Sequence, residues 1–468
     1  MLNGKGGHTG LPMFAGVQNF GPLRTYLTKF INGLINRLLP GQTRRFASAK
    51  IIFFAFVLLL TADRVIADSP SNETITLHDL IQEALEENPH IKAARASWNA
   101  SEAVPKQVST WPDPMLMFGI NNVGPKYSVG TQEMSMLDFG FAQKIPFPGK
   151  LSLLGKMAVR SAEAMGEEFK ATELNVIQKL KAAYFDYYYL KKSIDIINQT
   201  MSLLKKMERT AEIQYQVGKG IQQDVWRAKL EVSKLYERLQ IFSQMEGTTA
   251  GIINSILNRP TEEPVGMPIQ PEITSFTYTV NDFIKMAEEN SPELKKMERI
   301  IEREKSGLTY AKLQYLPDFS INLGWGERGA MENMWVAGIG VEIPLYFWRK
   351  QAYGVQESRA NLYFSENIYQ NTKQLLYSDI KSAYLNATTS RNLIDLYKTA
   401  IIPQASGAVD SSMAGYSVGK VDFLTMVTNA ITLLDYQIGY YEKLTEFEKA
   451  VAELEALTGV QFAAEGME

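Results

Sequence analysis

The side chains that most often do chemistry are scarce in this chain of 468 residues. It contains no cysteine and three histidines, of which only His78 and His90 lie beyond residue 67. Two isolated histidines without thiolates make a Cys/His metal site a poor prediction, and solvated helix positions explain them better. The sequence has no P-loop, no helical His–Glu metal pair and no Gly-x-Ser-x-Gly nucleophile motif. We therefore expect no enzyme activity, no cofactor and no bound metal.

Four methionines are the remaining candidates for metal chemistry. Met115, Met117, Met134 and Met136 share the parity of the small and polar residues along two predicted strands. A track of thioethers would suit Cu(I). Methionine is also an adaptable filler of irregular gaps, and this is the simpler interpretation.

Residues 1–67 have the features of a secretory leader that is removed. Basic residues precede the apolar run 51–62, and the small residues at 65–67 fit a cleavage site. The apolar run is short for a membrane span, which needs about 20 residues. Residues 1–43 form a basic amphipathic pattern, and the sequence leaves their role and the true translation start open.

Removal of this leader leaves an acidic chain. The 48 Lys and Arg less the eight in the leader leave 40, and the 51 Asp and Glu less one leave 50, a net charge of −10. Nucleic acid is therefore not an expected partner. The absence of cysteine also excludes lipid attachment at an N-terminal cysteine.

Residues 68–275 and 276–468 are predicted to be two copies of one unit. Short motifs recur in a constant order about 200 residues apart, which indicates an internal duplication. The matching pairs are 76–81 with 279–284, 87–89 with 290–292, 112–113 with 317–318, 144–146 with 342–344, and 215–219 with 416–420.

Each copy is predicted to contain two helices, two strands, a very long helix and a return helix. In the first copy we expect strands over about 115–123 and 134–145, a long helix over about 150–217, a return helix over about 221–257 and then a proline-rich linker. In the second copy we expect strands over about 318–326 and 334–343, a long helix over about 349–418 and a return helix over about 421–458. Near-heptad apolar steps along the first long helix predict a coiled-coil seam, and at 1.5 Å per residue the helix would be about 100 Å long. Pro403 predicts a kink in the second long helix.

An aromatic cluster lies in the middle of the first long helix. It comprises Tyr184, Phe185, Tyr187, Tyr188 and Tyr189. A belt at a membrane interface is one interpretation. The distance from the predicted strands favours packing among the helices instead.

The four predicted strands alternate between large apolar residues and small or polar ones. In the third strand, for example, Phe319, Ile321, Leu323 and Trp325 alternate with serine, asparagine and glycine. Such alternation over about ten residues is typical of transmembrane barrel strands. Four strands cannot close a barrel, since small barrels need about eight, and unpaired edges are not tolerated in lipid. The sequence therefore predicts that identical copies pool their strands.

The duplication, the strand pairs and the Tyr-x-Val-Gly turns resemble the TolC-type outer-membrane efflux proteins, nearest to their heavy-metal branch. The resemblance extends over about residues 74–460, and its most specific parts are residues 143–150, 416–420 and 450–459. It implies a mainly α fold with a small β part. Long antiparallel coiled-coil helices of a homotrimer would form a periplasmic α-barrel tunnel. Four strands per protomer would form a twelve-stranded β-barrel in outer-membrane lipid.

The same resemblance implies a passive exit duct. Metal ions or drugs would arrive from an inner-membrane RND pump through a periplasmic adaptor protein. The alternative is an outer-membrane duct for type I protein secretion by an ABC exporter. A secreted soluble coiled-coil scaffold is a remote alternative, which detergent-dependent extraction would test.

The resemblance also places the two turns after the long helices at the periplasmic tips. There they would contact the adaptor, because glycine leaves turn backbone accessible. A plain C-capping role for the glycines is the alternative interpretation. The predicted contact residues are Val217, Gly218, Lys219, Val418, Gly419 and Lys420.

A periplasmic gate is implied just beyond these turns, at Asp224, Tyr416, Asp422 and Thr425. We expect Tyr416 or Lys420 to hold Asp224 in the closed state. Thr425 stands where some members of the family have a second acidic residue, which argues against a tight acidic ring.

Overall fold

The computed structural model describes residues 74–122, 125, 129, 132–270, 273–274 and 277–462. These residues belong to one compact unit, Asn72–Glu468. The predicted leader, residues 1–67, lies outside the described residues.

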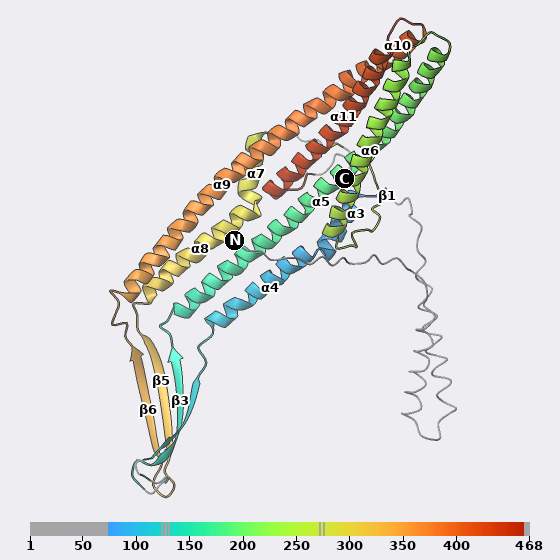
Figure 1. The fold of residues 1–468 in the computed structure, drawn as a ribbon. Helices are drawn as coiled ribbons and strands as arrows, with labels where there is room; N and C mark the ends of the chain where they lie inside the picture. Colours follow the sequence, from blue (N-terminus) through green and yellow to red (C-terminus); the bar gives the residue numbers. More distant parts are fainter. Residues whose placement is uncertain are drawn as a thin grey trace, which may run out of the picture. The chain divides into compact units, whose positions relative to one another are not determined.

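Each half of the described chain has the same order of elements (Figure 1). The first half contains β1 (Thr74–Ile75), α3 (Leu77–Glu87), α4 (Pro89–Ser109), β2 (Met115–Asn121), β3 (Met136–Ile145), α5 (Lys150–Gln216) and α6 (Gln222–Ile256). The second half contains β4 (Met267–Pro268), α7 (Val280–Asn290), α8 (Pro292–Leu313), β5 (Asp318–Glu327), β6 (Met334–Glu342), α9 (Lys350–Leu396), a π-helical turn η1 (Tyr397–Ile401), α10 (Ile402–Ser417) and α11 (Phe423–Thr458). Among the described residues, no helix is both long enough and apolar enough to cross a membrane.

Matching caps begin the short helices in the two halves. The hydroxyls of Thr76 and Thr279 accept hydrogen bonds from the backbone N–H groups three residues later, and Thr279 forms a reciprocal capping box with Asp282. α4 and α8 both have proline in the first turn, where the missing N–H has no intrahelical partner to lose. The repeated sequence motifs therefore specify repeated helix starts.

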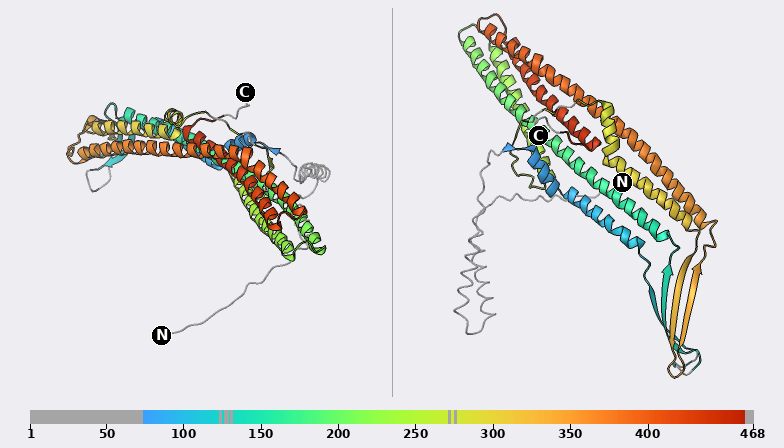
Figure 2. Two further views of the ribbon diagram at one scale, coloured as in Figure 1. Left: turned by 90° about the horizontal axis from the view of Figure 1, so that it is seen from above. Right: turned by 180° about the vertical axis from the view of Figure 1, so that it is seen from behind.

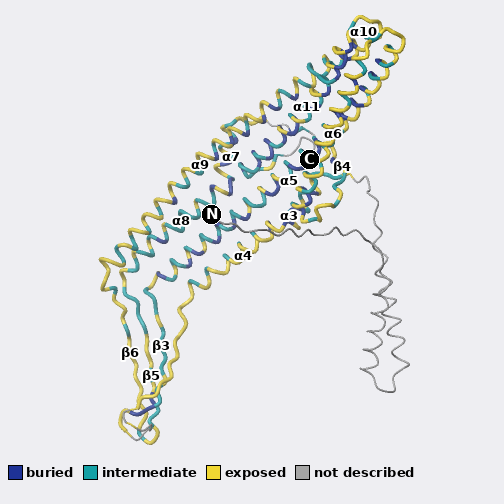
Figure 3. The backbone as a smooth tube through the Cα atoms, in the orientation of Figure 1, coloured by how far each residue is buried: buried dark blue, intermediate teal, exposed yellow. Residues whose placement is uncertain are grey.

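The apolar seam predicted along α5 forms much of the core. Most apolar residues of α5 from Phe169 to Ala211 are buried, whereas Tyr215 near the end of the helix is 46% exposed. The aromatic cluster of residues 184–189 is largely buried, with Tyr184 and Tyr188 at 2% and 1% exposure. Packing among the helices, rather than a membrane belt, is thus confirmed for this cluster. Figure 3 shows buried positions running along α5.

The second long helix is interrupted just before Pro403. The turn η1 has π-helical hydrogen bonding, and Pro403 lies at the start of α10. Proline has no N–H to donate, and its ring opposes the carbonyl four residues earlier, which here belongs to Thr399. A π-turn inserts one residue into a helix. The spacing between matching positions accordingly rises from 200 at the helix starts, Lys150 and Lys350, to 201 at Tyr215 and Tyr416.

The four longer strands form one antiparallel sheet in the order β2-β3-β5-β6. Its register places the large apolar residues of all four strands on one face. Phe118 pairs with Phe139, Phe139 with Trp325, and Trp325 with Trp335, so one aromatic row crosses the whole sheet. Small and polar residues such as Gly140, Asn322 and Gly338 alternate onto the other face.

The helices next to the sheet lie side by side as one layer. α9 packs on α8, α8 on α5, and α5 on α4 (Figures 1 and 2). Further along, α5 packs on both α6 and α11, and α11 packs on α9 and α10. α5 is therefore the helix that joins the two halves.

A buried carboxylate fixes the connection between the two halves. Glu448 of α11 is 3% exposed, and it accepts hydrogen bonds from the N–H and the hydroxyl of Thr274, both at 3.0 Å. Burial raises the pKa of Glu448 to about 6, against the lowering effect of these two hydrogen bonds and the charge of Lys181.

Replacing Glu448 with glutamine should change the pH dependence of stability. A carboxyl group whose pKa is raised in the folded state stabilises the protein below its unfolded pKa, and this stabilisation is lost as the pH rises through about 6. We expect Glu448→Gln to remove this loss and to increase the unfolding free energy at pH 7 by about 2 kcal/mol. Denaturant unfolding in detergent between pH 4 and 7 measures the difference between the two proteins. A difference that is independent of pH would contradict the assignment.

Candidate functional site

The two turns between the long helices and the return helices have the same backbone geometry. The Lys219 N–H donates to the Gln214 carbonyl at 2.8 Å, and the Gly218 N–H donates to the Tyr215 carbonyl at 3.0 Å. The Lys420 N–H and the Gly419 N–H make the corresponding bonds to Gly415 and Tyr416 at 2.9 and 3.1 Å. Both turns are Schellman motifs, so the capping role of the two glycines is established by the geometry.

Gly218 and Gly419 both have φ of +74°, a left-handed conformation that side chains strain. A Cβ at either position would meet nothing within 4 Å. Val217 and Val418 beside them are 60% and 68% exposed, and Lys219 and Lys420 are also exposed. The two tips thus offer apolar side chains, open backbone and one cation each. The predicted contact with an adaptor stays a proposal.

Asp422 and Thr425, two of the predicted gate residues, contact each other. The Asp422 carboxylate caps α11 by accepting a hydrogen bond from the Thr425 N–H at 2.6 Å. The hydrogen bonds from the Thr425 backbone and hydroxyl lower the pKa of Asp422. Asp422 is therefore an ionised helix cap. Its negative charge is favourable there, because the N-terminus of a helix carries a partial positive charge.

Asp224 and Tyr416, the other two predicted gate residues, lie close to each other. Burial and the charge of Asp422 raise the pKa of Asp224, and burial and the charge of Asp224 raise the pKa of Tyr416. The ring of Tyr416 packs edge-on against Phe423, with centroids 5.5 Å apart. Among the described residues, neither Tyr416 nor Lys420 forms a hydrogen bond or ion pair with Asp224 in one protomer. The predicted closing contact stays a proposal.

The two gate carboxylates are not counterparts in the duplication. At the spacing of 201 that relates the tips, Asp224 corresponds to Thr425, and Asp422 corresponds to Ile221. Ile221 and Asp422 are the N-cap residues of α6 and α11. Each hairpin therefore contributes one carboxylate, but at a different position of its helix.

A buried ion pair joins the sheet to the helices, and the sequence analysis did not predict it. Lys150 at the start of α5 is 4% exposed, and its Nζ lies 2.8 Å from Asp318 Oδ1 at the start of β5. The same ammonium donates to the Leu316 carbonyl at 2.9 Å, and the Phe147 N–H donates to Asp318 at 2.8 Å. Both residues stand in motifs that the sequence singles out, residues 143–150 and 317–318, but nothing in their spacing shows that they pair.

The methionines of the strands lie against glycines. Met117 contacts Gly140, and Met136 contacts Gly326, so that a Cβ on either glycine would be 3.2 Å or less from the thioether side chain. Met115, Met117 and Met136 share one face of the sheet, whereas Met134 precedes β3. In these contacts the methionine side chains fill the space beside the glycines. In the described ranges, no group of three or more His, Cys, Asp or Glu side chains could hold a metal ion.

Solved structures with this fold are outer-membrane channels. The chain matches the outer membrane channel MtrE of Neisseria gonorrhoeae with a TM-score of 0.70 and 14% identity, over 84% of this chain and 91% of that one. It matches the outer membrane protein VceC of Vibrio cholerae with a TM-score of 0.70 and 15% identity, over 83% and 97%. The fold is therefore that of TolC-like outer-membrane channels.

Sequence comparison places the chain within a family. Residues 80–239 and 283–460 match the family described as outer membrane efflux protein, one segment in each half. The chain belongs to the outer membrane efflux protein family. It is 18% identical to the cobalt-zinc-cadmium resistance protein CzcC of Cupriavidus metallidurans over 403 residues, which cover 82% of this chain and 90% of that protein. Its location is the outer membrane, with the helical part in the periplasm.

Proposed function

We propose that the chain is the outer-membrane duct of a tripartite efflux system and works as a homotrimer. The observation that carries this proposal is the four-stranded sheet. Its apolar face is uncovered, with Phe118 75% and Trp335 76% exposed. In the part of the chain that the structure describes, the outer edges of β2 and β6 have no strand neighbour.

Lipid would cover the apolar face of such a sheet, and strands of identical neighbours would pair with its open edges. An apolar outer face belongs in the hydrocarbon of a bilayer, and backbone groups at open edges there cost several kcal/mol each. Three copies would contribute twelve strands, and a small closed barrel needs only about eight strands. The chain itself supplies a passage, so the driving force comes from an inner-membrane pump, reached through an adaptor at the two tips.

Metal ions are the cargo that we favour. The support is the name of the relative CzcC, which describes resistance to cobalt, zinc and cadmium. A water-filled duct selects weakly, and the pump would choose the cargo. Deleting the gene and measuring growth on these metals, beside growth on hydrophobic drugs, separates the two cargo classes. Unchanged growth on the metals would contradict metal cargo.

The duct itself is tested by the state of the purified protein. We expect the protein to require detergent for extraction from membranes, to run as a trimer in native mass spectrometry and to form channels in planar bilayers. A monomer that dissolves in buffer without detergent would contradict the proposal. That outcome would favour the secreted coiled-coil scaffold.

Substitution of Asp224 tests the proposed gate. If Asp224 holds the tip closed through the neighbouring protomer, Asp224→Ala should raise the single-channel conductance. Gln223→Ala is the control, because Gln223 is an exposed neighbour of Asp224 on the same helix and is not one of the predicted gate residues. Equal conductance of Asp224→Ala and the wild type would remove Asp224 from the gate.

A further inference from the structure

The long helices α5 and α9 are counterparts in the two halves, but their surroundings differ. α5 packs on α4 and α6 of its own half and on α8 and α11 of the other half. α9 packs on α8 and α11 of its own half. Within the described residues, α9 has no comparable packing on α4 or α6. α9 therefore lacks the two neighbours from the other half, α4 and α6, that would give it the same surroundings as α5.

Exposed positions on α9 have buried counterparts on α5. Phe364, Leu385 and Leu396 are 65%, 51% and 47% exposed, and they lie 21 and then 11 residues apart along α9. Three turns of α-helix contain about eleven residues and six turns contain about twenty-two, so these spacings keep the three side chains on one side of the helix. Their counterparts at a spacing of 200, Ala164, Phe185 and Ile196, are 6%, 4% and 9% exposed. The same positions are therefore covered in one half and open in the other.

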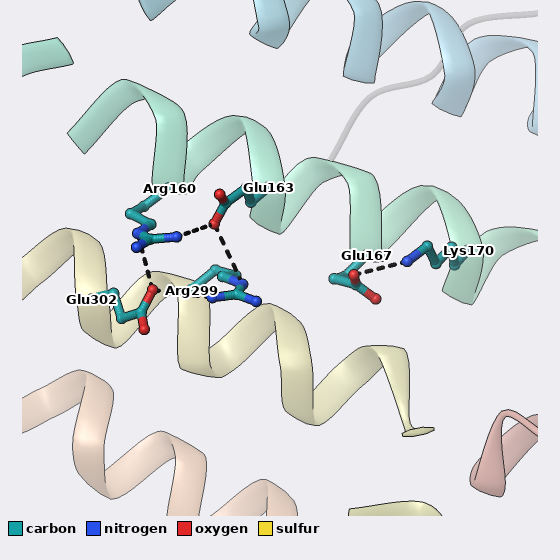
Figure 4. Close-up of polar contacts among 6 residues, drawn as sticks. All are labelled: Arg160, Glu163, Glu167, Lys170, Arg299 and Glu302. Carbon is teal, nitrogen blue, oxygen red and sulfur yellow. Dashed lines mark hydrogen bonds and ion pairs between the residues drawn. The ribbon is translucent and has the colours of Figure 1, made fainter. Parts of the chain in front are cut away.

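Charged side chains line the seam between the two halves within one chain. Arg160 and Glu163 of α5 form a closed network with Arg299 and Glu302 of α8, with Arg160 2.9 Å from Glu302 and Arg299 3.4 Å from Glu163 (Figure 4). Other ion pairs continue this seam. They join Lys296 to Glu168 at 2.6 Å and, on α11, Lys449 to Asp186 at 2.9 Å and Glu455 to Lys181.

The corresponding positions on the open edges cannot form these ion pairs. On α9, the counterparts of Arg160, Glu163, Glu168 and Asp186 are Ala360, Tyr363, Ile368 and Asn386. On α4, at a spacing of 203, the counterparts of Lys296, Arg299 and Glu302 are Ala93, Ala96 and Asn99, and on α6 the counterpart of Lys449 is Thr248. These eight charged residues are replaced by neutral ones. Lys181 keeps its charge in its counterpart Lys381, but the counterpart of Glu455 is Asn254, so none of the ion pairs is repeated.

We propose that the seam between protomers is a copy, without ion pairs, of the charged seam within each protomer, an inference that rests on the trimer of the proposed function. α9 of one protomer packs on α4 and α6 of the next, in the manner of α5 on α8 and α11. Phe364, Leu385 and Leu396 are then covered by the second copy, as apolar interface cores require. The seam with ion pairs forms only inside a chain and the seam without them only between chains, so the two seams differ in chemistry and discourage incorrect pairing.

Pairs of introduced cysteines test this arrangement. The wild-type chain has no cysteine, so the introduced thiols are the only ones present. Arg160 contacts Glu302, and the Thr445 hydroxyl donates to the Phe185 carbonyl at 3.1 Å. The counterpart pairs are Ala360→Cys with Asn99→Cys, and Leu385→Cys with Gln244→Cys. A short bismaleimide should link each pair between chains in detergent-solubilised trimers, whereas the mismatched pair Ala360→Cys with Gln244→Cys should not react.

A charge test measures the same seam without a cross-linker. Ala360→Arg with Asn99→Glu recreates the internal ion pair across protomers, and Ala360→Glu with Asn99→Glu places like charges there. We expect the like-charge variant to lower the trimer-to-monomer ratio by about tenfold relative to the opposite-charge variant. Trimers that give no matched cross-link, or equal ratios for the two variants, would overturn the seam and leave the duct intact. A wild type without trimers would overturn the proposed function itself.

Discussion

Replacing Lys150 with methionine should lower the unfolding free energy by about 3–5 kcal/mol, because it leaves the Asp318 carboxylate buried without its cation. Lys150 lies 2.8 Å from Asp318 where the sheet meets the helices, and the side chains of the pair are 5% and 19% exposed. The substitution also removes the hydrogen bond to the Leu316 carbonyl. Denaturant unfolding of the protein in detergent, followed by tryptophan fluorescence, measures this loss.

A second variant separates the buried charge from general damage to the junction. Adding Asp318→Asn to Lys150→Met removes the uncompensated charge and keeps an oxygen that can accept from the Phe147 N–H. Most of the lost stability should return in this double variant. Lys144→Met is the matched control at the same junction. The Lys144–Glu342 ion pair has a distance of 2.7 Å, and its side chains are 50% and 69% exposed. We therefore expect its loss to lower the unfolding free energy by less than about 1 kcal/mol. Equal losses for Lys144→Met and Lys150→Met would contradict the argument from burial.

Phe139→Arg should prevent most of the protein from assembling in the membrane. Phe139 lies inside the aromatic row, 5.5 Å from the rings of both Phe118 and Trp325. In the proposed barrel this row faces lipid, where an arginine near the middle of the bilayer costs about 2–4 kcal/mol. A trimer would contain three such arginines. The amount of trimer recovered from outer-membrane fractions measures the effect.

Asn322→Arg is the control for this substitution, because Asn322 points to the opposite face of the same sheet. An arginine on that face would meet water inside the barrel and should leave the trimer yield close to that of the wild type. If the two arginine variants assembled equally well, the apolar face would not be the lipid face.

Local patterns explain why much of the fold could be predicted from the sequence. Period-two alternation predicted the face of each strand residue. Thr76 and Thr279 marked the starts of two helices, and Pro89 and Pro292 marked the starts of the next two. The Val-Gly dipeptides predicted the two turns, because glycine alone adopts the left-handed conformation there without strain, whereas the family resemblance implied their place at the tips. These signals depend only on residues a few positions apart.

Contacts between distant residues could not be predicted in the same way. Lys150 and Asp318 are 168 positions apart, and Glu448 and Thr274 are 174 apart. Single residues with ordinary spacing do not show which carboxylate will be buried or which backbone group it will bind. The sequence analysis placed Asp224 and Asp422 just beyond the two turns, and the register of the two halves shows that they occupy different positions of their helices.

The π-turn at Tyr397–Ile401 bears on how such a long rod can change in length during evolution. A helix that gains one residue normally rotates everything beyond it by about 100°, which would turn its apolar stripe away from its neighbours. By absorbing the extra residue in a single widened turn, the second copy restores the phase of its stripe before the tip. The two hairpins can therefore present matching ends although the second long helix is one residue longer than the first.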